Sequence, residues 1–134
     1  MSLDVPAGLL AAAEAGEVSD EDFAECVRGS FPYVWQLVSG LSTRLHGQGG
    51  PFADNTDPPS TEAERGQLLR ALAADSVRGC LERRFGVKLA FQNCYRVAVF
   101  PASDGQAGME SGSYLRFVSP RAQLLNQSPE VRSC

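Results

Sequence analysis

The sequence predicts one α+β domain over residues 1–134, and three observations lead to that prediction. With 134 residues and a mass of 14.4 kDa, the chain has the length of a single domain and can bury a core without disulfides or metals. Through the first two thirds, apolar residues recur three and four apart, which is helical spacing. From residue 87 onward, β-branched and aromatic residues dominate. We therefore expect a helical part over 3–85, an antiparallel sheet of two to three strands within 87–118, and a short helix over 119–127.

Three helices are expected before the first glycine-rich segment. The first spans residues 5–15 with Asp4 as its cap, and the second opens at Ser19, followed by three acids that favour a helix N-terminus. Ser30 and Pro32 mark the cap and the first turn of the third helix. Its apolar face consists of Val34, Leu37, Val38, Leu41 and Leu45.

A loop and a long fourth helix are expected next. Residues 47–60 are rich in glycine, proline and small polar residues, and a loop of this length in a compact domain is often functional or disordered. Thr61 and Glu64 have the spacing of a capping box, and the helix that they open should run to about Arg84, where Gly86 suits a left-handed stop. The inward residues of this helix are expected to be Leu69, Leu72, Ala73, Val77, Cys80 and Leu81, with Arg65, Arg70, Arg78 and Arg83 mostly outward.

The strand predictions concern the last third of the chain. Residues 87–91 and 95–100 have strand composition, and residues 92–94 between them suit a tight hairpin turn; the alternative is one long strand through residue 100. Residues 101–112 are expected to be a flexible link, and 114–118 a third strand.

Composition and charge exclude several protein classes. No stretch reaches 18 apolar residues and the N-terminus lacks a signal-peptide layout, so we expect a cytoplasmic protein without a membrane contact. The net charge is −4, with nine acids and two bases in residues 1–60 and an excess of bases in 61–134. A pI near 4.9 opposes nucleic acid as a partner, whereas the two oppositely charged halves can attract each other within the fold or between protomers.

Cysteine usage predicts neither a metal nor a cofactor. Cys26, Cys80, Cys94 and Cys134 form no C-x-x-C pair, and His46 is the single histidine. Without a secretion signal the thiols are expected to be reduced, and two of them, Cys26 and Cys80, fall on apolar helix faces. The sequence has no P-loop, no nucleotide-binding glycine motif after a strand, and no metalloprotease or serine-hydrolase motif, which disfavours an enzyme.

Polar residues of four segments are candidates for a site. Asp54 and Asn55 follow Phe52 in the loop, where they bind a ligand or, as we favour, satisfy turn backbone. Gly66 lies in a first helical turn at a cost of about 1 kcal/mol relative to Ala, which invites close approach of another backbone or of a ligand; helix packing is favoured. Residues 123–129 are an amphipathic helix end, expected to dock within the domain. The candidate ligand or partner residues are Asp54, Asn55, Arg65, Gln67, Arg70, Gln92, Asn93, Cys94 and Arg96.

The fourth segment, residues 91–96, supplies the one candidate nucleophile. Cys94 lies beside Arg96, whose charge can lower a thiol pKa. However, His46 is distant in sequence, and no motif ties it to Cys94. The amides and Arg96 are therefore expected to satisfy buried backbone groups or to line a partner groove.

Several of these blocks resemble a family of small actinobacterial (Streptomyces-type) cytoplasmic proteins of uncharacterised function. The blocks are Phe52-Ala53-Asp54-Asn55, residues 64–72, Phe91-Gln92-Asn93-Cys94, residues 96–100 and residues 124–129. The resemblance covers nearly the whole chain, implies a bacterial cytoplasmic origin, and transfers no activity or functional residue. Tyr95 departs from the family, in which histidine is more usual, and this weakens a Cys–His catalytic hypothesis.

The leading functional hypothesis is a non-enzymatic interaction or regulatory module that self-associates as a homo-oligomer or binds a protein partner. The alternative is a small-ligand-binding protein or small enzyme. Its site would form where the 52–55 loop meets the start of the 61–84 helix and the 91–96 strand. A third hypothesis, nucleic-acid binding by the arginines of the fourth helix, is opposed by the acidic pI.

Overall fold

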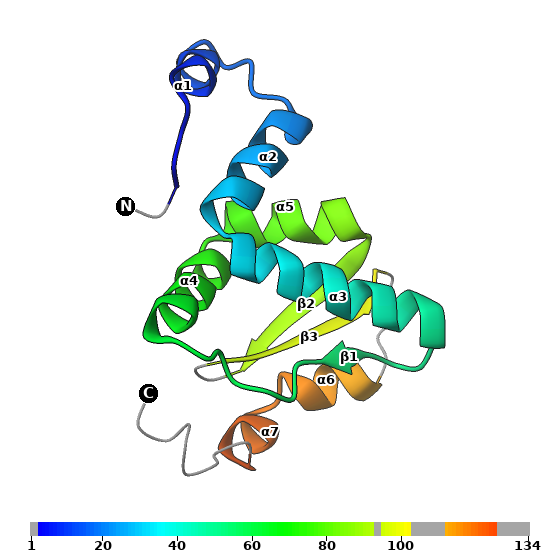
Figure 1. Ribbon diagram of the computed structural model, residues 1–134. Helices are drawn as coiled ribbons and strands as arrows, with labels where there is room; N and C mark the ends of the chain where they lie inside the picture. The colour runs from blue at the N-terminus through cyan, green and yellow to red at the C-terminus, as the bar shows by residue number, and fades with distance from the viewer. Residues whose placement is uncertain (1–2, 93–94, 103–111, 126–134) are drawn as a thin grey trace.

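The computed structural model describes residues 3–92, 95–102 and 112–125, and it confirms the predicted α+β class. A three-stranded antiparallel sheet carries helices on both faces (Figure 1). In chain order the elements are α1 (Ala7–Glu14), α2 (Asp20–Ser30), α3 (Pro32–Gln48), β1 (Ala53–Asp54), α4 (Glu62–Ala73), α5 (Asp75–Phe85), β2 (Val87–Gln92), β3 (Arg96–Pro101), α6 (Gly112–Phe117) and α7 (Pro120–Leu125). No helix in these ranges has the length and apolarity needed to cross a bilayer.

The larger core lies between the sheet and helices α2 to α5. Alternate strand residues face the helices, as the two-residue period of a strand requires; among them are Leu89, Val97 and Val99. The helices contribute fully or almost fully buried aliphatic side chains, which include Val27, Val34, Val38, Leu68 and Leu81. Cys80 belongs to this core and Cys26 is also buried, so the prediction that both thiols fall on apolar helix faces is confirmed.

A smaller aromatic core lies on the opposite face of the sheet, under α6. Phe100 of β3 is fully buried there, 5.3 Å from the ring of Phe52, 5.3 Å from that of Tyr114 and 5.7 Å from that of Phe117. Offset and edge-to-face pairs of this kind contribute beyond the area that they bury. The aromatic core therefore attaches α6 to the sheet.

Strands β2 and β3 form an antiparallel hairpin, which excludes one long strand. Val87 pairs with Pro101 at one end and Gln92 with Arg96 at the other, while residues 93–94 lie outside the described part of the chain. The third strand is β1, inside the segment predicted to be a loop, and the strand order is β1-β3-β2. The sheet prediction was thus wrong in placing all strands within 87–118.

The third strand predicted at 114–118 is part of α6 instead. Tyr-Leu-Arg-Phe-Val has strand composition, but Tyr114 and Phe117 are three residues apart and both contact Phe100. One helical turn places such residues on one face, whereas a strand would point them to opposite faces. Tertiary packing of the aromatic pair therefore decides this segment.

The predicted fourth helix is two helices, α4 and α5, separated at Ala74. Ala74 is extended (φ −94°, ψ 117°), and Arg78 donates from Nη1 to the carbonyl oxygen of Leu72 at 2.8 Å. That bond satisfies one of the carbonyls left unpaired at the end of α4. Because the chain changes direction at residue 74, Leu72 and Val77 are both buried, while Leu69 and Ala73, predicted to be inward, are exposed.

Three of the predicted helix ends are confirmed. The hydroxyls of Ser19 and Thr61 accept from the amides of Asp22 (3.1 Å) and Glu64 (3.0 Å), and Gly86 has a left-handed backbone (φ 64°). The Glu64 carboxylate accepts from Ser60 rather than from Thr61, so the capping box is shifted by one residue on that side.

Two predicted caps are wrong. Pro6 and Phe31 occupy the cap positions of α1 and α3. Asp4 and Ser30 bond to each other instead, with the Asp4 amide donating to Ser30 Oγ at 2.8 Å. This contact fastens the chain ahead of α1 to the last turn of α2.

Candidate functional site

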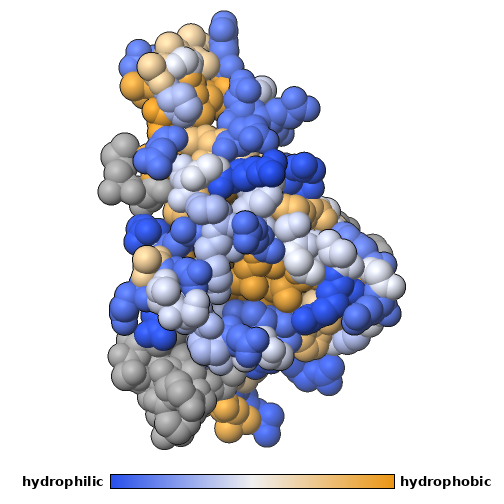
Figure 2. All heavy atoms as spheres, viewed as in Figure 1, coloured by the Kyte–Doolittle hydropathy of each residue, from blue (hydrophilic) through white to orange (hydrophobic). Residues whose placement is uncertain are grey.

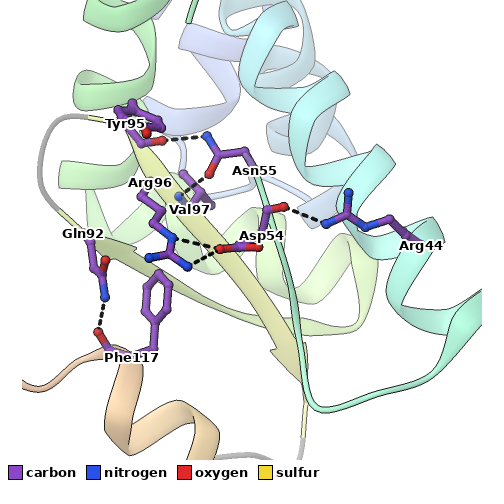
Figure 3. Close-up of polar contacts among 8 residues, drawn as sticks. All are labelled: Arg44, Asp54, Asn55, Gln92, Tyr95, Arg96, Val97 and Phe117. Carbon is purple, nitrogen blue, oxygen red and sulfur yellow. Dashed lines mark hydrogen bonds and ion pairs between the residues drawn. The ribbon is translucent and has the colours of Figure 1, made fainter. Parts of the chain in front are cut away.

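Asn55 supplies the most specific polar contacts at the β1 edge of the sheet (Figure 3). Its backbone amide donates to the carbonyl of Val97 at 3.2 Å, which continues the β1–β3 ladder. Its side chain then takes the place of a further strand residue: Oδ1 accepts from the Val97 amide at 2.8 Å, and Nδ2 donates to the carbonyl of Tyr95 at 2.7 Å. The side chain is buried, so these bonds replace water for two backbone groups of β3.

Asp54 and Arg96 form a partly buried ion pair beside it. Arg96 Nε and Nη2 lie 2.8 and 2.5 Å from Asp54 Oδ2, with the two side chains 30% and 18% exposed, respectively. The guanidinium also lies over the ring of Phe117, 5.3 Å from its centroid. On the other side, Arg44 of α3 donates from Nη2 to the Asp54 carbonyl at 2.6 Å. The pair therefore joins β1 and β3 to helices on both faces of the sheet.

Gln92 completes this cluster. It is buried at the end of β2, and its Nε2 donates to the carbonyl of Phe117 at 2.5 Å (Figure 3). Its Oε1 is buried with no hydrogen-bond partner, as are Ser42 Oγ and Arg65 Nε. The bond from Gln92 satisfies a carbonyl at the end of α6 and fixes that helix against the sheet.

The three candidates on α4 lie outside this cluster. Gln67 Oε1 accepts from the Val34 amide at 3.0 Å, and so serves one of the unpaired donors of the first turn of α3. Arg70 is exposed and its guanidinium lies against Gly66, where a Cβ would be 3.0 Å from Nη1. Arg65 is half-buried on the same helix. The close neighbour of Gly66 is therefore the Arg70 side chain of the same helix, and the bond of Gln67 is made to α3.

Asn93 and Cys94, the remaining candidates, lie outside the described residues. The polar residues of the loop and of the strand pair, Asp54, Asn55, Gln92 and Arg96, come together, and those of the helix are separate from them. Each of these four is bonded to the chain itself. The hydrogen bonds and the ion pair of this cluster connect the sheet to α3 on one face and to α6 on the other, so the role of the cluster is structural.

A groove between α3 and residues 55–64 was not predicted from the sequence. Its volume is about 620 Å³, and its lining includes Tyr33, Leu37, Arg44, Asn55, Asp57 and Glu64. Burial raises the pKa of the Tyr33 phenol, and the negative charge of Glu64 raises it further. The phenol is therefore a neutral hydrogen-bond donor at physiological pH. The residues meet only because the chain reverses after α3, and no local pattern encodes that reversal.

The Cys80 thiol is buried, and its surroundings disfavour the reactive thiolate. Burial raises the pKa of its thiol; nearby Arg83 opposes this shift and Asp20 adds to it. Cys26 is buried as well and is a free thiol. Within residues 3–92, 95–102 and 112–125, no three His, Cys, Asp or Glu side chains are grouped so that they could hold a metal ion.

Thiol labelling tests this environment. In the variant Cys94→Ser/Cys134→Ser only Cys26 and Cys80 remain, and we expect both to react with Ellman's reagent at pH 8 at least about 100-fold more slowly than in denaturant, because both side chains are buried and access needs local opening. Equal rates in folded and unfolded protein would contradict the buried placement of these thiols.

The comparisons with known proteins identify a family but no activity. A family model described as NucS shadow ORF matches residues 1–134, which is the whole chain. No curated protein and no solved structure matches it. The description names no reaction, ligand or partner, in keeping with the resemblance to an uncharacterised family. The chain belongs to the NucS shadow ORF family.

Proposed function

We propose that this protein is a non-enzymatic interaction or regulatory module that self-associates, and that it acts in the cytoplasm of an actinobacterium. One observation carries the self-association: seven of the eight exposed large hydrophobic side chains in the described ranges gather at two ends of the molecule. Val5, Leu10 and Val18 lie in or beside α1, and Leu115, Val118, Leu124 and Leu125 in or beside α6 and α7. Apolar groups that gather on a surface are typical of interaction sites.

The polar candidate residues also favour an interaction module over a ligand-binding site, because their hydrogen bonds are made within the chain. Asp54, Asn55, Gln67, Gln92 and Arg96 all bond to other groups of this chain. Among the candidates that the structure describes, Asn55 alone lines the groove between α3 and residues 55–64, which is the site left to the small-ligand alternative. It therefore ranks second.

Nucleic acid is the third candidate partner. KH modules clamp a nucleotide backbone with a GXXG loop, which joins their two helices. Ala74 alone separates α4 from α5, so no such loop lies between these two helices. Residues 47–50 have the GXXG spacing and follow α3 instead. With a pI near 4.9, the chain lacks the charge for a nucleic-acid clamp.

Native mass spectrometry and sedimentation under reducing conditions test the proposal. Between about 1 and 200 µM, we expect a concentration-dependent shift from 14.4 kDa to whole multiples of that mass, with no added mass. A bound small molecule would favour the alternative. A monomer over the whole range would refute self-association.

A further inference from the structure

One end of the molecule is apolar and acidic. This acidic end, residues 3–30, comprises α1, its flanking segments and α2, and none of the side chains of α1 is buried. Val5, Leu10 and Val18 are 38%, 52% and 41% exposed. Seven exposed acids accompany a single base, Arg28, which gives the acidic end a net charge of −6. The acids are Asp4, Glu14, Glu17, Asp20, Glu21, Asp22 and Glu25.

The other end is apolar and basic. This basic end, residues 112–125, comprises α6 and α7. Leu115 and Val118 are 53% and 46% exposed, and Leu124 and Leu125 are 72% and 69% exposed. For these two leucines the expectation that residues 123–129 dock within the domain is therefore wrong, while residues 126–129 lie outside the described part of the chain. Arg116 and Arg121 are exposed, and the segment holds no acid, so its net charge is +2.

The two ends lie at opposite extremes of the fold. In Figure 1, α1 is at the top of the molecule and α7 at the bottom, and the sheet lies between them. Figure 2 shows hydrophobic residues over α1 at the upper end and over α7 at the lower end. Helix α2 packs against α3 and α5, while α6 lies on the opposite face of the sheet. One molecule therefore cannot bring its own two ends together.

We propose that the acidic end of one copy docks on the basic end of a second copy, in a head-to-tail contact that rests on the self-association proposed above. Both surfaces expose aliphatic side chains, and their charges are opposite, so the contact gains burial and electrostatic complementarity together. Pairing two acidic ends would instead bring fourteen acids against two arginines. Like charges that face each other at an interface are costly.

This arrangement has a consequence for assembly. A head-to-tail contact is heterologous, so each copy still has one free end after a dimer forms. Association continues to a ring or an open chain, and does not stop at a symmetric dimer.

Two variants that each block one end provide the test. In Leu10→Asp the acidic end is blocked, and in Leu124→Asp the basic end; both side chains are exposed, so the fold tolerates the change. We expect each variant alone to self-associate at least about tenfold more weakly than the unmodified chain. In an equimolar mixture, each variant still offers one intact end. The mixture should therefore form a one-to-one dimer, resolved in native mass spectra by ¹⁵N-labelling one variant, and nothing larger.

Leu69→Asp is the matched control, because Leu69 on α4 is the eighth exposed large hydrophobic and belongs to neither end. Its association should match that of the unmodified chain. Raising the salt from about 0.05 to 0.5 M should weaken association severalfold if opposite charges contribute.

The proposal is overturned if the mixture gives no mixed dimer, or if Leu124→Asp alone still dimerises through its acidic ends. Either result leaves self-association standing, because the unmodified chain would still form multiples of its mass. A monomeric unmodified chain removes both proposals, and points to a different protein as the occupant of the two ends.

Discussion

Replacing Asn55 by Ala should lower the free energy of unfolding by about 2–4 kcal/mol, a severe effect for a single small side chain. The amide group satisfies the Val97 N–H and the Tyr95 carbonyl, and the residue is buried. Alanine leaves both backbone groups without their protein partner at a buried position, and each orphaned group costs about 1–3 kcal/mol. Denaturation with urea, followed by the fluorescence of the single tryptophan, Trp35, measures the change.

Two further variants at this edge sharpen the result. Thr56→Ala is the control, because Thr56 is the exposed next residue and its loss should change stability by less than about 0.5 kcal/mol. Asn55→Asp should destabilise at least as much as Asn55→Ala, because its carboxylate can accept from Val97 but places a second, buried acceptor against the carbonyl of Tyr95. Equal stability of Asn55→Ala and the unmodified chain would mean that water replaces the amide, and that the edge is open.

The role of Asn55 was predicted only in part from the sequence. The residue type and its position after Phe52 indicated an amide that satisfies backbone, which is what the structure shows. The backbone satisfied, however, belongs to β3, about 40 residues along the chain, rather than to the local turn. The residue type predicts that the side-chain amide needs hydrogen-bond partners, but which backbone groups serve as partners depends on the tertiary structure.

The same distinction between local and tertiary determinants applies to the helices and strands. The caps at Ser19 and Thr61 and the left-handed stop at Gly86 are local, and they were predicted correctly. For residues 87–100 the sequence left a hairpin and one long strand as alternatives, and the pairing of β2 with β3 decides for the hairpin. Strand β1 has two residues and exists only through its pairing with β3, so no periodicity within it could be detected.

The wrong predictions for residues 61–84 and 114–118 have a shared cause. Residues 61–85 have helical spacing throughout, yet the helix is interrupted at Ala74, where Arg78 donates across the break to the Leu72 carbonyl. Residues 114–118 have strand composition, but the aromatic core selects a helix. In both cases contacts from another element outweigh a local preference of a few tenths of a kcal/mol per residue.

For the candidate site, too, the residue types could be predicted from the sequence and their contacts could not. The sequence named the polar groups, and contacts between Asp54 and Arg96, or between Gln67 and Val34, required the tertiary structure. Arg44 and Tyr33 were missed because each acts from α3 on a segment at least ten residues away, Arg44 on Asp54 and Tyr33 beside Glu64.

The aromatic core under the sheet carries the last prediction. Phe100→Ala should destabilise the protein by about 3–5 kcal/mol, because the residue is fully buried and its ring contacts three other aromatic rings. Leu115→Ala on α6 is the control. That side chain is 53% exposed, so its loss should change stability by less than about 0.5 kcal/mol.

The same pair of variants separates folding from association. Leu115 belongs to the basic end, so its replacement should weaken self-association while urea denaturation remains unchanged. Phe100→Ala removes the surface on which α6 packs, so it should lower both stability and association. A stable Phe100→Ala variant would show that α6 is attached by other contacts, such as the bond from Gln92 to the Phe117 carbonyl. A Leu115→Ala variant that lost stability as well would place that side chain in the core, and would remove it from the docking surface.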